Sequence, residues 1–145
     1  MDYREFAKDL LARKNNLVAA YGAIRDELNL LESEKTACKA LMNESEALGK
    51  DKTLYEDRFI NTLANLDDCR FRLNVVEREL KKIEKGMNCL GDYERALLDT
   101  FYVDSPDYAA DELMERYYKE RSSLYRDKNR ALDSFTRSIF GVLEL

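Results

Sequence analysis

The sequence contains no histidine and no tryptophan, only one proline and only five glycines. Without histidine it lacks the commonest general base and the commonest metal ligand of proteins. Proline and glycine supply the tight turns of β-sandwiches and barrels, so their scarcity argues against those folds. The mixture of alanine, leucine, glutamate, lysine and arginine that is present favours long helices instead.

The cysteines are few, and long apolar runs are missing. Cys38, Cys69 and Cys89 are widely spaced and include no CxxC pair, which argues against a closed zinc site and a disulfide framework. The N-terminal residues show no secretory signal, and no stretch approaches the roughly 18–20 apolar residues that cross a bilayer. We therefore expect a cytoplasmic protein with reduced thiols and no membrane partner.

The size and charge of the chain limit the alternatives further. Its 145 residues correspond to one domain or two small ones. Charged residues make up 37% of the chain, and 24 basic against 29 acidic side chains give a net charge of −5. Because DNA is a polyanion, this acidic balance makes nucleic-acid binding a poor first hypothesis.

Apolar residues recur every seven positions in two stretches of the first 90 residues, from Tyr3 to Cys38 and from Phe59 to Leu90. Such heptads predict two long helices whose apolar stripes are buried against each other. The polar segment 43–52 between them contains a glycine and predicts a chain reversal. We therefore expect residues 1–90 to form a long antiparallel, coiled-coil-like helical hairpin that serves as a dimerisation or partner-binding arm. The seam residues of the hairpin or dimer are expected to be Leu17, Tyr21, Ile24, Leu28, Leu31, Leu66, Leu73, Val76, Leu80 and Ile83.

Residues 91–145 predict three shorter helices. The first is expected over 92–102, and the second over 108–117, with Ser105 as its N-cap before a proline. The third is expected over 121–140, ending at a glycine. Three helices of these lengths, the last two tightly joined, fit a helix-turn-helix module, and generic three-helix packing is the alternative. The fold class expected for the whole chain is all-α.

The charge is unevenly distributed along the chain. Residues 116–130 carry six positive and two negative side chains, a local charge of +4 that leaves −9 for the rest. A basic stretch at the start of a recognition helix is typical of phosphate contact, although most basic helix faces are simply solvated. Hydroxyl and amide groups among the basic residues could bind phosphates, and Arg121, Ser122 and Arg126 could reach base edges. The candidate DNA-binding residues are Arg116, Lys119, Arg121, Ser122, Ser123, Tyr125, Arg126, Lys128, Asn129 and Arg130.

Residues 122–132, SSLYRDKNRAL, resemble the last helix of sigma-factor region-4-like domains. The segments 94–98 and 135–141 are also similar to phage late-transcription regulators of the ArpU/RinA type. The resemblance covers residues 92–141 by sequence and residues 1–90 only by architecture. It implies a phage or prophage regulator of late genes in a bacterial cytoplasm, binding double-stranded DNA as a homodimer and recruiting or obstructing RNA polymerase.

Two positions depart from the pattern that this family shows. Glu120 stands where the family usually has a helix-capping serine, which places a carboxylate near the expected phosphates. Segment 117–119 lacks the usual glycine of the turn. These departures leave room for a second hypothesis from another class: a phage-encoded inhibitor or adaptor that reuses this fold to bind a protein. Its target would be a host nuclease such as a CRISPR effector, or another regulator.

The sequence offers no catalytic constellation. Asp67 and Asp68 are adjacent, but neither a glycine-rich phosphate loop nor a histidine accompanies them. The remaining carboxylates alternate with lysine and arginine at helical spacing, as on a solvated, ion-paired surface. We therefore expect no enzymatic activity, no metal and no cofactor.

Overall fold

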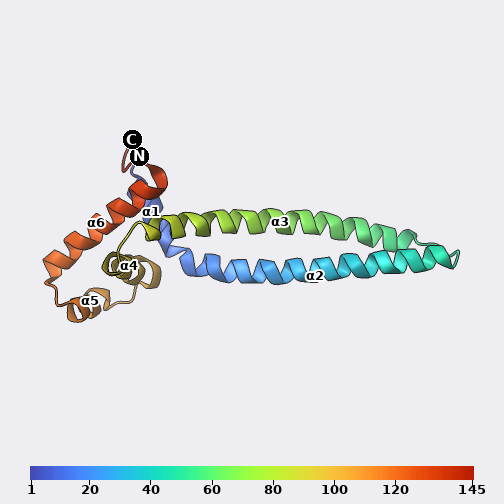
Figure 1. The fold of residues 1–145 in the computed structure, drawn as a ribbon, viewed down its shortest axis with the longest axis horizontal. Helices are drawn as coiled ribbons and strands as arrows, with labels where there is room; N and C mark the ends of the chain where they lie inside the picture. Colours follow the sequence, from blue (N-terminus) through green and yellow to red (C-terminus); the bar gives the residue numbers. More distant parts are fainter. The chain divides into compact units, whose positions relative to one another are not determined.

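The computed structural model describes all 145 residues, and every regular element in it is helical. In chain order the elements are α1 (Tyr3–Ala12), α2 (Lys14–Ala47), α3 (Thr53–Asn88), α4 (Asp92–Leu98), the π-helix η1 (Asp99–Asp104), α5 (Ala109–Tyr117) and α6 (Arg121–Phe140) (Figure 1). The all-α class expected from the sequence is confirmed. None of the helices combines the length and the apolarity needed to span a membrane.

The chain divides into two compact units. One consists of residues 19–77 and the other of residues 1–18 together with 78–145. This division differs from the ranges 1–90 and 91–145 that the sequence suggests. The reason is that α1 and the last turns of α3 share a core with the C-terminal helices.

In the unit of residues 19–77, α2 and α3 lie side by side and run in opposite directions (Figure 1). The buried cluster between them consists of Ile24, Leu31, Leu66, Cys69 and Leu73, with Ala20, Tyr21, Leu28 and Val76 packed at its edges. Ion pairs flank this seam: Arg72 lies 2.8 Å from Glu27, and Arg70 pairs with Glu32. The expected packing of the two long helices is confirmed. The other expected seam residues lie beyond this cluster: Leu17 and Ile83 join the core of the second unit, and Leu80 is half-buried.

The ends of α2 and α3 form the chain reversal that the sequence predicts. The reversal lies at the expected place, and Gly49 adopts a φ of +67° just after the last helical residue of α2. At the start of α3, the carboxylate of Asp51 accepts hydrogen bonds from the backbone N–H and the hydroxyl of Thr53. These two hydrogen bonds lower the pKa of Asp51.

The second unit is built from segments that are far apart in the chain. Its main buried cluster consists of Ala7, Leu10, Leu11, Ile83, Met87, Leu90, Leu98, Ala131, Leu132 and Phe135. Gly86 allows α3 and α6 to approach closely, because a Cβ at this position would lie 2.5 Å from the ring of Phe135. The guanidinium of Arg4 on α1 lies 2.8 Å from Asp133 on α6. This core packs against α6 and holds the helix in place.

The expected helix over 92–102 is present but changes type along its length. It begins as α4 and widens into η1, in which the N–H of Ser105 bonds the carbonyl of Thr100 five residues earlier. Ser105 has a φ of +42° and ends η1, and α5 begins only at Ala109. The expectation that Ser105 caps the next helix is therefore wrong, since an N-cap residue has extended backbone angles.

Candidate nucleic-acid interface

The last helix, α6, has the bounds that its sequence pattern predicts. Its N-cap is Glu120, which has extended backbone angles and makes no side-chain capping hydrogen bond. Gly141 ends the helix with a φ of +81°. The buried residues of α6 are Leu124, Ala131, Leu132, Phe135 and Thr136. They share one side of the helix, so the opposite side of α6 faces solvent.

The connection between α5 and α6 is a three-residue turn, residues 118–120. It reverses direction without glycine, because Tyr118 itself adopts left-handed angles, with φ +54° and ψ +45°. The side chain of Tyr118 is 94% exposed, so no packing contact compensates the strained backbone. A buried cluster of Leu97, Ala110, Leu113 and Leu124 holds α4, α5 and α6 together around this turn.

Four of the expected DNA-contacting residues form a stripe on the outer side of α6. Ser122, Arg126, Asn129 and Arg130 are all exposed and lie on successive turns of the helix. Arg126 and Arg130 are neighbours at i, i+4 spacing, and neither forms an ion pair within the chain. Their guanidinium groups are therefore free to bind an external anion.

Two other basic residues of the predicted set are engaged inside the chain. The guanidinium of Arg121 lies 3.0 Å from Asp111 on α5, and the ammonium of Lys119 lies 3.7 Å from Asp127 on α6. Both pairs reduce the positive potential near the start of α6. Arg116, at the end of α5, is exposed and lies 5.2 Å above the ring of Tyr117.

Lys128 occupies a cluster of aromatic rings rather than the outer stripe. Its ammonium lies 4.7 Å from the ring centre of Tyr125, 5.1 Å from Phe101 and 5.8 Å from Tyr102. Burial among these rings, together with the charge of Lys8, lowers the pKa of Lys128. Such cation–π contacts hold η1 against α6, so Lys128 has a structural contact in addition to its charge.

Tyr93 on α4 is hydrogen-bonded to α6, a contact that the sequence pattern does not reveal. Its hydroxyl donates a 2.7 Å hydrogen bond to Asp127. Burial, and secondarily this hydrogen bond, raises the pKa of Tyr93 well above its ordinary value. Because Asp127 also pairs with Lys119, one carboxylate links α4, the turn and α6. The sequence shows Tyr93 only as one more apolar position of a helix.

Arg137 extends the outer stripe toward the C-terminal end of α6. It is exposed, forms no ion pair, and follows Arg130 by two helical turns. The charge pattern around 116–130 does not include it, because Arg137 lies beyond that range and Asp133, which pairs with Arg4, comes between it and Arg130. The stripe therefore contains three free guanidinium groups.

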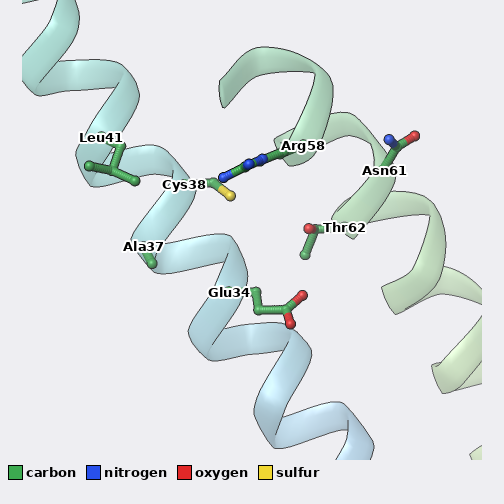
Figure 2. A pocket seen from close by; sticks show the side chains of 7 residues that line it. All are labelled: Glu34, Ala37, Cys38, Leu41, Arg58, Asn61 and Thr62. Atoms are coloured by element: carbon green, nitrogen blue, oxygen red, sulfur yellow. The ribbon is translucent and has the colours of Figure 1, made fainter. Parts of the chain in front are cut away.

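The remaining candidate is a hollow of about 450 Å³ between α2 and α3. Figure 2 shows that Cys38 and Thr62 line it and that the Arg58 side chain extends from α3 toward α2. Small side chains at positions 37, 38 and 62 leave this part of the seam incompletely filled. No group of three or more cysteine, aspartate or glutamate side chains in the chain could hold a metal ion. The hollow is a packing gap whose lining includes only one cysteine and one glutamate as possible metal ligands.

Comparisons of this chain with protein-family models, with curated proteins and with solved structures gave no match.

Proposed function

We propose that α5 and α6 form a helix-turn-helix module that binds double-stranded DNA, with α6 in the major groove. The observation that carries this proposal is the outer stripe of α6, on which Arg126 and Arg130 are exposed and unpaired between Ser122 and Asn129. An α-helix fits the width of the major groove, and an arginine can bind guanine through two hydrogen bonds. Small polar side chains beside the arginines complement phosphates or base edges.

The rest of the module suits this task by fixing α6 rigidly. Asp127 receives Tyr93 and Lys119, and Lys128 lies among three rings, so the helix is held on the side opposite to its stripe. Arg116 at the end of α5 would reach the phosphate backbone, as residues of the first helix do in such modules. We infer that the function is transcriptional regulation, and the sequence resemblance noted above supports phage or prophage late genes as its target.

The test is the binding of duplex DNA from upstream of the protein's own operon, measured by fluorescence anisotropy at several salt concentrations. Affinity should fall linearly with salt on logarithmic axes, because each neutralised phosphate releases counterions. Arg126→Ala and Arg130→Ala should each cost about 1–3 kcal/mol for a base contact, or reduce the salt slope by about one for a phosphate contact.

Lys39→Ala provides the matched control, because it removes one exposed positive charge from α2. It should leave both the affinity and the salt slope close to those of the unmodified protein. No binding at low salt, or equal effects of Arg126→Ala and Lys39→Ala, would contradict the proposal.

A second candidate function is protein binding, as an inhibitor or adaptor directed at a host nuclease or another regulator. The observation that favours it is the neutralisation of Arg121 and Lys119 by Asp111 and Asp127, beside the carboxylate of Glu120 at the N-cap. These contacts lower the positive charge where a recognition helix needs it most. A stoichiometric protein partner that survives nuclease treatment, in a chain that shows no salt-sensitive DNA binding, would favour this candidate.

A further inference from the structure

The outer side of α6 contains one acidic residue, Asp133, among its arginines. Asp133 follows Arg130 by three positions and precedes Arg137 by four, so its carboxylate is within reach of both guanidinium groups. On a helix, an acidic residue four positions before a basic one is the favourable order for an ion pair. The helix by itself would therefore pair Asp133 with Arg137 and leave the outer stripe with fewer free positive charges.

Asp133 instead binds Arg4, which lies on α1 at the other end of the chain. The Nε–H of Arg4 donates a 2.8 Å hydrogen bond to Oδ1 of Asp133, and the two residues are 129 positions apart. The side chains of Arg4 and Asp133 are only 31% and 32% exposed, so solvent and salt screen this pair less than a fully exposed pair. Arg130 and Arg137 form no ion pair, although Asp133 is close to both in the helix.

The guanidinium of Arg4 is held in one orientation by two further carboxylates. Its Nη1 lies 3.4 Å from Asp2 and 3.2 Å from Glu144, while its Nε is directed at Asp133. The backbone N–H of Arg4 also donates a 2.9 Å hydrogen bond to Asp2. The hydrogen bond to Asp133 is the main cause that raises the pKa of Arg4. Because the planar guanidinium is already oriented, it loses little further freedom in binding Asp133.

We propose that Arg4 is a positioning residue of the DNA-binding face: it binds Asp133 and thereby keeps Arg130 and Arg137 free for phosphates or bases. Arg4 does not need to touch DNA for this role. Without it, the carboxylate of Asp133 would pair with Arg137 or would repel phosphates beside the outer stripe. Either result lowers the positive potential that attracts DNA. This inference rests on the proposed function, because it concerns the same face of α6.

The attachment of α1 to α6 does not depend on this ion pair. Ala7, Leu10 and Leu11 of α1 are buried in one cluster with Ala131 and Phe135 of α6. Burial of apolar surface is the larger contribution to such packing, whereas partly exposed ion pairs contribute little to stability. Loss of the pair should therefore leave α1 in place and change mainly the charges that α6 presents.

Anisotropy titrations with the duplex DNA described above test the role of Arg4. Arg4→Ala should raise the dissociation constant roughly tenfold and lower the salt slope by about one, because Asp133 then neutralises one guanidinium of the outer stripe. The double variant Arg4→Ala/Asp133→Asn should restore both values, although it also lacks the ion pair. Asp133→Asn alone should bind DNA at least as tightly as the unmodified protein.

Arg13→Ala is the matched control, because it removes one positive charge at the end of α1 that is paired with Asp9 rather than with α6. It should leave the dissociation constant and the salt slope nearly unchanged. Circular dichroism should show the same helicity in all of these variants.

Side-chain NMR of the protein without DNA provides a second, independent measurement. The Nε–H signals of Arg130 and Arg137 should shift in Arg4→Ala, and in the double variant they should return toward their original positions. Signals that do not shift in Arg4→Ala would overturn the inference, and so would a double variant that binds DNA as weakly as Arg4→Ala. If the unmodified protein binds no DNA at low salt, the proposed function fails, whereas the NMR signals still decide whether Arg4 keeps these two arginines free.

Discussion

The unit of residues 19–77 and the unit formed by residues 1–18 and 78–145 achieve burial in different ways. In the first, two helices pack through a repeated pattern, and their small cluster is bordered by ion pairs and by an incompletely filled hollow. In the second, α1, the end of α3 and α6 meet in one core although they are far apart in the sequence. The unit of residues 19–77 tolerates gaps in its packing, whereas the unit of residues 1–18 and 78–145 depends on close contacts at single positions.

Two glycines, one in each unit, allow the difference in packing density between the units to be measured. A Cβ at Gly22 on α2 would meet no atom within 4 Å, whereas at Gly86 on α3 it would lie 2.5 Å from the fully buried ring of Phe135. Gly86→Ala should therefore destabilise the protein by about 1–3 kcal/mol, because a rigid ring in a closed core must move. Gly22→Ala should stabilise it by about 1 kcal/mol through helix propensity alone. Urea unfolding followed by circular dichroism measures both.

Equal effects of the two alanine substitutions would contradict the contrast between an open and a closed unit. In the expected case, the two substitutions have opposite signs although the residue change is identical. Gly86→Ala should lower the DNA affinity only in proportion to the fraction of the protein that it unfolds.

A hydrogen bond under α6 provides the second test. Tyr93→Phe removes the 2.7 Å bond to Asp127 and should cost about 1–2 kcal/mol at pH 8, because the acceptor is charged. Folding raises the pKa of the Tyr93 hydroxyl above its value in the unfolded chain, which is about 10. The hydroxyl therefore stabilises the folded protein fully below about pH 10, and this stabilisation is lost as the pH rises toward the pKa in the folded protein. The difference in unfolding free energy between the two proteins should therefore shrink above about pH 10.

Tyr55→Phe in α3 is the matched control for this substitution, because Tyr55 is also half-buried but makes no hydrogen bond within the chain. Its effect on the unfolding free energy at pH 8 should be small. An unchanged unfolding free energy in Tyr93→Phe would show that the ring, rather than the hydroxyl, supports α6.

The smallest effect is expected in the turn between α5 and α6. Tyr118→Gly should stabilise the protein by about 1 kcal/mol, because glycine adopts the observed φ of +54° without a Cβ clash. Tyr118→Ala removes the same exposed ring but keeps the strain, so it should change the stability little. Thermal unfolding of the pair isolates the backbone effect, and a stabilisation shared by both variants would assign it to the ring instead.

Periodicity predicted the features that depend on neighbouring residues. The packing of α2 on α3, the reversal at Gly49 and the bounds of α6 with its buried Leu124 and Phe135 all follow from apolar spacing and from glycine. The cap at Ser105 was mispredicted, because the residue before a proline favours the extended backbone of an N-cap, whereas Ser105 ends η1 with a φ of +42° and a hydrogen bond to Thr100. The local sequence does not reveal that the preceding helix continues to this residue.

The candidate interface was predictable as a charged stretch but not as a set of free groups. Counting charges treats Lys128 and Arg130 alike, yet Lys128 lies among rings of η1 and α6 while Arg130 is exposed. Tyr93 has no charge at neutral pH and therefore gives no signal in such a count. Which basic side chains remain available depends on partners that come from other helices.

The sequence by itself determined that the chain is helical, where its two longest helices pair, and that positive charge gathers around residues 116–130. These properties arise from the period of the α-helix and from composition, which are local. Only the tertiary structure decided that α1 and the end of α3 form one core with α6, and that Arg126 and Arg130 stay unpaired. Such outcomes depend on contacts between residues distant in the chain, and their geometry follows from packing rather than from spacing along the sequence.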